Sequence, residues 1–218
     1  MKKFFLATSS NFVKGLVYEC AKLYFPHIEV VDVMNDEHLM FHLGYPEDNL
    51  LLIDKFFLGF YLHDTVEGIK GLNQKLRFVF FETGDCNEYF GLRVYNLGAS
   101  GYIPDMKDTE TLKQHLNKVM NGLPTFPEIV KDDIERGMHL DARYCGEPTK
   151  SEFKIAVLLA QNKSVKEIAN ETHVETHTVS NHIYWLKRKI GARNLNDYKE
   201  VYDQMVNRNV GGWNGCKS

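Results

Sequence analysis

The sequence has little cysteine and no long apolar run. Its four cysteines, Cys20, Cys86, Cys145 and Cys216, are scattered without CxxC spacing, so we expect inert thiols in a reducing cytosol. No stretch approaches the roughly 18 uninterrupted apolar residues of a membrane span, and the start MKKFFLATSS carries no long apolar segment. We therefore expect no membrane span and no signal peptide, and we predict a cytoplasmic protein.

The motifs of common enzymes are also missing. The sequence contains no Gly-rich phosphate loop and no nucleophile–base motif, so we predict a protein that is not an enzyme and needs no cofactor. Nine histidines are present. His173, His177 and His182 lie close together, but no cysteine or carboxylate accompanies them at ligand spacing, and we predict no metal site.

The C-terminal third carries the pattern of four short amphipathic helices. We expect them over residues 149–161, 165–171, 176–190 and 196–206. Thr149 followed by Glu152 fits a capping box, which helps the first helix to begin. A tight polar turn at residues 173–175 separates the second helix from the third. Together they predict a compact all-α domain.

The helix expected at residues 176–190 has two different faces. Val179, Ile183, Leu186 and Ile190 recur at helical spacing, which predicts one buried stripe. The opposite face carries polar and cationic residues: His177, Ser180, Asn181, Tyr184, Lys187 and Arg188. A helix with one buried side and one hydrogen-bonding, cationic side can lie in a DNA major groove. An ordinary helical hairpin is the alternative.

Several motifs of this segment occur in order and at the spacing of one known family. They are T-K-S-E (149–152), S-V-K-E-I-A (164–169), T-V-S-N-H (178–182) and L-K-R-K-I (186–190). Residues 148–206 thereby resemble the C-terminal helix-turn-helix domain of the LuxR/FixJ/NarL family of bacterial regulators, which implies DNA binding. Pro148, Ser151 and Asn162 depart from the family's usual residues, although Asn162 tolerates the left-handed conformation needed at a helix end.

The resemblance assigns roles to the polar face. It implies base-reading side chains at Ser180, Asn181 and Tyr184, and periodicity independently points Asn181 and Tyr184 outward. His177, near the helix start, is expected at a phosphate or a base edge. Four further residues are expected to contact phosphates and so to set register rather than sequence: Lys166, Thr178, Lys187 and Arg188.

Charge is divided unevenly along the chain. The net charge is only −3, but residues 1–147 contain 15 Lys and Arg against 22 Asp and Glu, a net −7, whereas residues 148–208 contain 10 against 7, a net +3. The positive segment is the one with the helix pair, as phosphate binding requires. Because the excess is small, an auxiliary protein that works by pairing with another regulator stays an alternative.

The N-terminal part alternates apolar runs with amphipathic stretches. Strands are expected over residues 4–7, 29–33, 50–53, 77–81 and 101–103. Helices are expected over residues 11–24, 36–43, 61–73, 87–96 and 109–121. This alternation predicts a five-stranded parallel sheet of flavodoxin-like order with both faces covered. The crevice at the carboxyl ends of such strands is where a small molecule or a protein partner could bind.

Three local matches make this part resemble the receiver domain of response regulators: L-L-L-I-D (50–54), F-F-E-T (80–83) and G-A-S-G-Y-I (98–103). The resemblance implies a phosphate acceptor at Asp54, a switch residue at Thr83 and an aromatic switch at Tyr102. A phosphorylating receiver also needs an acidic pair after the first strand and a Lys after the fifth. Here those places read A-T-S-S (7–10) and P-D (104–105). We therefore predict a degenerate receiver, or pseudo-receiver, with Asp54 as a vestigial acceptor.

These features predict a receiver-like domain at residues 1–122, a linker at 123–147, a helix-turn-helix domain at 148–208 and a flexible tail at 209–218. The function they favour is a sequence-specific transcriptional regulator of the two-component type that binds double-stranded DNA as a homodimer without needing phosphate. A phosphorylation-controlled response regulator using Asp54 is a further alternative.

Overall fold

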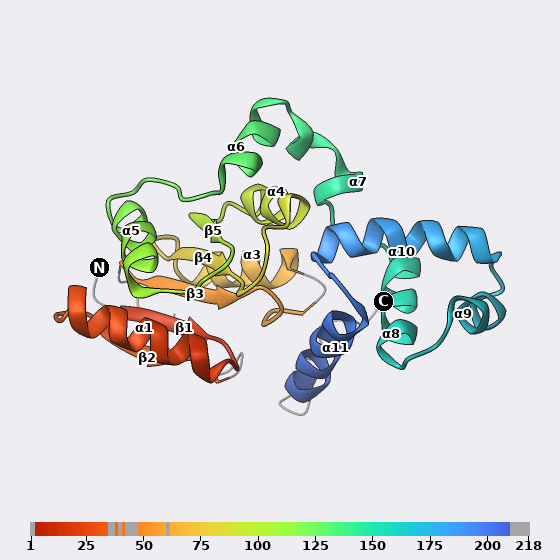
Figure 1. The fold of residues 1–218 in the computed structure, drawn as a ribbon, viewed down its shortest axis with the longest axis horizontal. Coiled ribbons are helices and arrows are strands. Elements are labelled where there is room, and N and C mark those ends of the chain that lie inside the picture. The colour runs from red at the N-terminus through yellow and green to blue at the C-terminus, as the bar shows by residue number, and fades with distance from the viewer. Residues whose placement is uncertain (1–2, 35–37, 39–40, 42–47, 60–61, 210–218) are drawn as a thin grey trace.

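A computed structural model describes residues 3–34, 38, 41, 48–59 and 62–209 of the chain (Figure 1). Most of the helix expected at residues 36–43, and the tail after residue 209, lie outside the described residues. None of the helices in the described ranges is long and apolar enough to cross a membrane.

Five parallel strands form one sheet in the order β2-β1-β3-β4-β5. They are β1 (Lys3–Ala7), β2 (Glu29–Asp32), β3 (Leu50–Asp54), β4 (Arg77–Phe81) and β5 (Gly101–Ile103). All four neighbouring pairs are parallel, so the expected flavodoxin-like order is confirmed. The carboxyl ends of the strands meet at one edge, and this edge is where ligands bind in such sheets.

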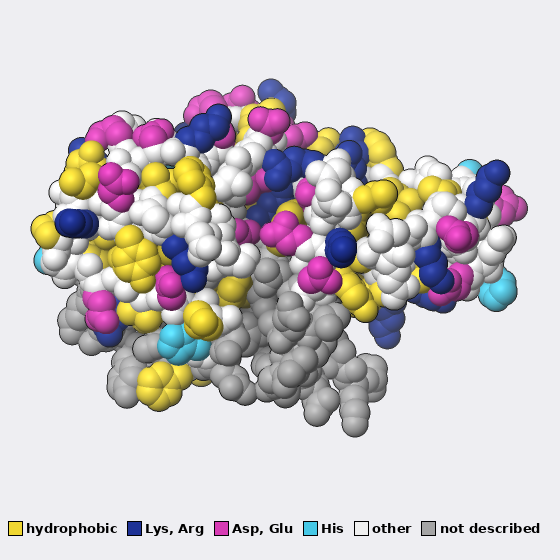
Figure 2. Space-filling view, turned by 60° about the horizontal axis from the view of Figure 1, so that its bottom comes forward, with side chains coloured by type: hydrophobic (Ala, Val, Ile, Leu, Met, Phe, Trp, Pro, Cys, Tyr) yellow, Lys and Arg dark blue, Asp and Glu magenta, His cyan; other side chains and the backbone are white. Residues whose placement is uncertain are grey.

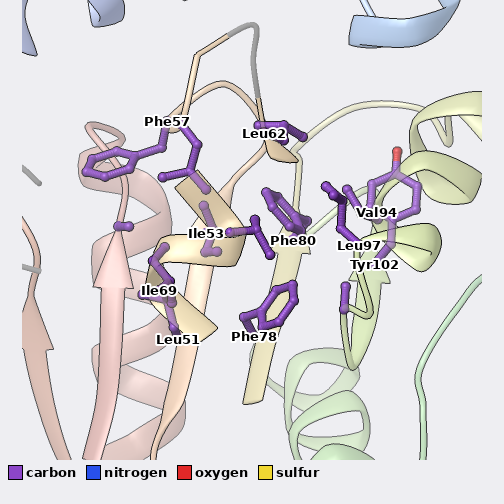
Figure 3. Packing of buried hydrophobic residues seen from close by; sticks show 14 of the residues in the cluster. Leu51, Ile53, Phe57, Leu62, Ile69, Phe78, Phe80, Val94, Leu97 and Tyr102 are labelled. Carbon is purple, nitrogen blue, oxygen red and sulfur yellow. The ribbon is translucent and has the colours of Figure 1, made fainter. Parts of the chain in front are cut away.

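Side chains along the strands alternate between two apolar clusters because successive residues of a strand face opposite sides. Phe5, Leu51, Ile53, Phe78 and Phe80 lie on one face. That face is covered by α3 (His63–Leu72) and α4 (Glu88–Asn96) (Figure 3). The other face is covered by α1 (Asn11–Tyr24) and α5 (Thr109–Met120) (Figure 1). We call this part of the molecule the α/β lobe.

The segment predicted as a linker is folded onto the α/β lobe. It contains α6 (Glu128–Glu135), η1 (Met138–Leu140) and α7 (Ala142–Cys145). Phe126, Val130 and Cys145 are buried in the same cluster as the strand residues of the α3/α4 face. Since these contacts bury apolar side chains, the segment is a packed arm rather than a loose tether.

Four helices make up the second part, which we call the helical lobe. They are α8 (Lys150–Ala160), α9 (Val165–Thr172), α10 (Thr176–Ile190) and α11 (Leu195–Asn209). Thr149 and Glu152 form the predicted capping box at the start of α8. Asn162 has a φ of 62°, which is the left-handed conformation expected there. The expected fold class, an α/β domain followed by a four-helix helix-turn-helix domain, is confirmed.

Candidate nucleic-acid interface

A two-helix unit is built by α9 and α10. Ser164 caps α9 and forms a second capping box with Glu167. His173 ends α9 in the left-handed conformation with a φ of 55°, and the Val174 N–H donates to the carbonyl oxygen of Ala169 at 3.1 Å. This cap reverses the chain within three residues, so α10 starts at once and crosses over α9.

The predicted apolar stripe of α10 is buried. Val179, Leu186 and Ile190 are 0%, 0% and 3% exposed, and the partly buried Ile183 packs in the same cluster. Their neighbours in that cluster include Ile155 of α8 and Ile168 of α9. Truncating one such fully buried aliphatic side chain to Ala costs about 2–5 kcal/mol. The back of α10 is therefore fixed by packing, and its front is held in a single orientation.

The front of α10 is open to solvent. Six of the eight residues predicted to contact DNA are exposed: Lys166, His177, Ser180, Asn181, Tyr184 and Lys187. Tyr184 is 48% exposed despite its size. Thr178 and Arg188 are half-buried. The structure thus brings the predicted residues of α10 onto one helix, while Lys166 lies on the adjacent α9.

Two of these side chains already have local partners. The Ser180 hydroxyl donates to the carbonyl oxygen of Thr176 at 3.0 Å, which leaves its lone pairs for a donor on a ligand. His177 Nδ1 lies 3.0 Å from Glu175 Oε2, and its Nε2 lies 3.2 Å from the Thr178 hydroxyl. A phosphate that approached His177 would also meet the negative charge of Glu175.

Arg188 is held by two aromatic rings. Its guanidinium lies 3.6 Å from the centroid of the Tyr184 ring and 5.1 Å from the centroid of the Tyr89 ring, which belongs to α4 of the α/β lobe. Cation–π contact of this kind orients a guanidinium without neutralising it. Arg188 is therefore placed at the end of the exposed row, next to the α/β lobe.

Lys189 is one member of the basic run that does not face solvent. Its Nζ lies 2.9 Å and 3.2 Å from the two carboxylate oxygens of Glu152, and the two side chains are 7% and 6% exposed. Sequence reasoning missed this buried ion pair. A usable signal was present, because Lys189 lies three residues after the buried Leu186 and next to Ile190.

The receiver-like edge of the sheet holds Asp54 in a closed set of contacts. The Thr8 hydroxyl donates to Asp54 Oδ2 at 2.9 Å, and the Phe56 N–H donates to Oδ1 at 3.3 Å. Burial raises the pKa of Asp54, and these two hydrogen bonds oppose that shift. Thr8 stands where an acidic pair would begin, so a hydroxyl occupies the side of Asp54 at which a cation would be held.

Next to Asp54 lies a buried charge network. Lys55 Nζ lies 2.8 Å from Glu82 Oε2, with both side chains under 5% exposed. The Tyr102 hydroxyl donates to the other oxygen of Glu82. Burial lowers the pKa of Lys55, although Glu82 partly offsets this, and burial together with Glu82 raises the pKa of Tyr102.

The switch role expected at Thr83 stays a prediction, and the sheet register places another residue directly at the end of β4. Asp54 pairs with Phe81 in the sheet, so the residue that immediately follows β4 beside Asp54 and Tyr102 is Glu82. Thr83 is exposed, one position further along. Asp105, predicted in place of a cation after β5, is paired with the exposed Lys107 at 2.6 Å. Within the described ranges, no group of three or more His, Cys, Asp or Glu residues is arranged to hold a metal ion.

Comparison with known proteins locates the family signal in the helical lobe. Residues 149–199 match the family model described as "Bacterial regulatory proteins, luxR family". The transcriptional regulatory protein DesR of Bacillus subtilis is 29% identical over 103 residues, which cover 47% of this chain and 48% of DesR. BvgA of Bordetella pertussis, a transcription regulator of virulence factors, is 26% identical over 134 residues, which cover 61% of this chain and 64% of BvgA. The matched region thus spans about half of DesR and just under two thirds of BvgA.

Solved structures are similar over nearly the whole chain. RcsB of Salmonella enterica serovar Typhimurium, bound to promoter P1flhDC in the presence of the phosphomimetic BeF3⁻, has a TM-score of 0.59 at 16% identity, covering 94% of this chain and 98% of RcsB. A structure of two RcsB dimers bound to two parallel DNAs has a TM-score of 0.56 at 17% identity, covering 93% and 98%. At such low identity the likeness shows the fold.

Proposed function

We propose that this chain, a LuxR/NarL-type response-regulator-like protein whose helical lobe is a luxR-family domain, is a cytoplasmic, sequence-specific DNA-binding transcriptional regulator. The observation that carries the proposal is the exposed front of α10 above a back that packs into the helical core. A helix fixed in this way can enter the major groove as a rigid reader. Reading DNA requires no reaction, so we assign no catalytic residue.

On α9 and α10 the side chains proposed to contact DNA divide into two groups. Asn181 can pair with both the N6 and N7 atoms of adenine, and Ser180 and Tyr184 flank it on the same face. Lys166, Lys187 and Arg188 would contact phosphates, together with Thr178 and the imidazole of His177. Phosphate contacts weaken with salt and do not depend on the base sequence. Base contacts do depend on the base sequence.

The protein acts as a dimer in this proposal, so that two recognition helices meet two half-sites about one helical turn apart. The α/β lobe would supply dimerisation, and the strand-end edge would be a place for a small-molecule or protein partner. Phosphate is not needed. A phosphoryl group on Asp54 would add about −1.5 to −2 charge, and the neighbouring cation Lys55, whose charge acts on Asp54, is already paired with Glu82.

The test begins with selection of bound duplexes from a random-sequence pool by the wild-type protein. On the selected duplex we expect Asn181→Ala to lose about 1–3 kcal/mol of binding free energy relative to random DNA, because a base contact is lost. Lys187→Ala is the matched control on the same face and should weaken selected and random duplexes alike. Equal losses for Asn181→Ala on both duplexes would remove its base-reading role.

Phosphate independence has its own test. The protein is incubated with acetyl phosphate and Mg²⁺, and its intact mass and its affinity for the selected duplex are then measured. We expect no stable adduct and unchanged affinity, since no carboxylate accompanies Asp54 at residues 7–10. A phospho-adduct at Asp54 with much tighter binding would refute this part and favour a phosphorylation-controlled response regulator.

A second candidate is an auxiliary regulator that acts mainly by pairing with another transcription factor. The observation in its favour is the net charge of only +3 on residues 148–208, which gives weak attraction to phosphates. Weak binding of the isolated protein to every selected duplex, restored by a partner regulator, would favour this candidate over the first.

A further inference from the structure

The two lobes meet through buried polar contacts as well as apolar ones. Figure 1 shows the C-terminal end of α10 beside α4 and α7, while the rest of α10 extends away from the α/β lobe. Figure 2 shows Lys and Arg side chains gathered in the recess between the lobes. The residues that carry the contact, which we call the latch, are Lys55, Phe56, Glu82, Arg93, Glu147 and Gly191.

Arg93 spans the junction from α4. Its side chain is 2% exposed, and one Nη donates to the carbonyl oxygen of Lys189 at 3.1 Å near the end of α10. The other Nη lies 2.6 Å from a carboxylate oxygen of Glu147, just before α8. Glu147 in turn accepts from the backbone N–H groups of Leu62 and His63 at 3.2 Å and 3.0 Å. One guanidinium thus ties the start and the end of the helix-turn-helix region to the α/β lobe.

Phe56 and Lys55 make the second contact, directly after Asp54. The Phe56 ring is 6% exposed and belongs to the apolar core of the helical lobe, although the residue is part of the α/β chain segment. The Lys55 side chain lies against Gly191, which joins α10 to α11, and its ammonium group is paired with Glu82. Arg193, within the connection between α10 and α11, lies 4.0 Å from the same carboxylate.

Gly191 lets these surfaces close. A Cβ at this position would lie 2.6 Å from Lys55 Cε and 3.1 Å from Phe90 Cβ. Its φ of 70° is a left-handed conformation that ends α10, so the residue meets both a local and an inter-lobe requirement. A side chain at Gly191 would have to displace the end of the Lys55 side chain, which is paired with Glu82, and would crowd Phe90 of α4.

The latch leaves the front of α10 free. Contacts with the α/β lobe involve Arg188, Lys189 and Gly191 at the C-terminal end of the helix. Asn181 lies eight residues before Lys189, which is about 12 Å along the helix axis at 1.5 Å per residue, and it is exposed. The docked arrangement therefore covers the end of the recognition helix and not the side chains proposed to read bases.

We infer that the latch locks the two lobes into one rigid unit and that this docked unit is the form that engages DNA. The second half of this inference rests on the proposed function. If the α/β lobes dimerise, a rigid joint fixes the separation of the two recognition helices, and the second helix then binds at a high effective concentration only when the half-site spacing matches. A loose joint lowers affinity at the matched spacing and tolerates other spacings.

Gly191→Asn is the variant that tests the latch, with Gly137→Asn as its matched control. Both glycines have a positive φ, 70° and 76°, and Asn tolerates this conformation better than other side chains. A Cβ at Gly137 meets nothing within 4 Å, so the pair isolates inter-lobe crowding from backbone strain. Glu147→Gln, at a partly exposed residue, is a second variant that weakens the Arg93 contact without adding bulk.

Small-angle scattering of the full chain measures docking, and circular dichroism verifies that each variant is folded. We expect Gly191→Asn and Glu147→Gln to have a larger radius of gyration than the wild-type protein. Gly137→Asn should have the same radius of gyration as the wild-type protein. Binding is measured on the duplex selected by the wild-type protein and on the same duplex with five base pairs inserted between half-sites. Wild type and Gly137→Asn should bind the duplex with the insertion at least about tenfold more weakly than the selected duplex. The two latch variants should bind the selected duplex about tenfold more weakly than the wild-type protein does. The insertion should reduce their affinity by a smaller factor.

An unchanged radius of gyration in both folded latch variants would overturn the latch. Expanded latch variants that bind the selected duplex as tightly as Gly137→Asn, or more tightly, would show that the docked unit is not the binding form. Absence of DNA binding by the wild-type protein and all variants would refute the proposed function, while expansion of the latch variants would still support the docked unit.

Discussion

Lys189 allows a test of whether a residue in the basic run of α10 stabilises the fold instead of facing DNA. In Lys189→Met the methionine fills much of the same volume, but the Glu152 carboxylate loses both contacts at 2.9 Å and 3.2 Å while staying buried. Removing one partner of a buried ion pair costs about 3–5 kcal/mol. Glu152 keeps the Thr149 N–H at 2.7 Å, so we expect a loss of about 3 kcal/mol in the free energy of unfolding.

Urea denaturation followed by circular dichroism measures this loss, and two controls sharpen it. Lys187→Met lies two residues earlier on the exposed front and should change the free energy of unfolding by less than about 0.5 kcal/mol. Lys189→Met combined with Glu152→Gln should recover most of the loss, because a neutral amide still accepts from Thr149 and leaves no buried charge. A single-variant loss below about 1 kcal/mol would mean that Glu152 turns to solvent, which would refute the structural role.

Two further predictions concern titratable groups of the α/β lobe. The pKa of Asp54 is raised by burial, so the folded state holds the proton more tightly than the unfolded state, and stability falls as pH rises from the unfolded pKa through the folded one. Asp54→Asn should remove this fall in urea denaturation measured from pH 4 to 8, and an identical pH profile for wild type and variant would contradict it. Burial raises the pKa of the Cys86 thiol to about 12, so at pH 8.5 we expect alkylation by iodoacetamide at least about a hundredfold slower than for a free thiol. Mass spectrometry of digested protein measures the rate at Cys86, and a rate near that of a free thiol would contradict the raised pKa of this half-buried thiol.

Local signals explain what the sequence could predict. The strands were evident because short apolar runs alternate with amphipathic stretches, and α8 was evident because Thr149 and Glu152 lie three residues apart, within one helical turn. The stripe from Val179 to Ile190 follows from helical periodicity alone. Each of these patterns is contained within one element, so no knowledge of its neighbours is needed.

Long-range pairs explain what the sequence could not predict. Arg93 and Glu147 are 54 residues apart, and Lys189 and Glu152 are 37 apart. Periodicity treats each of these as a solvated surface charge, because charged side chains are rarely buried unless paired. The partner becomes visible only in the folded chain: Lys189 meets Glu152 where α10 packs against α8 within the helical lobe, and Arg93 meets Glu147 where the two lobes join. The same limit applies to Thr83 and Glu82. A motif match does not show where a strand ends, whereas the pairing of Asp54 with Phe81 shows that Glu82 is the first residue after β4.

The strand-end edge of the α/β lobe connects these observations. In an open parallel sheet this edge is the place for a ligand, and here the residues directly after β3 and β4, Lys55 and Glu82, neutralise each other. Lys55 and Phe56 then face Gly191 and the helical core instead of a solvent-filled crevice. Since the charges are satisfied internally, an added phosphoryl group would have to break the pair in order to be neutralised. The sequence departures at residues 7–10 and 104–105 and the docking of the helical lobe thus support the proposal that this edge holds a domain rather than a phosphate.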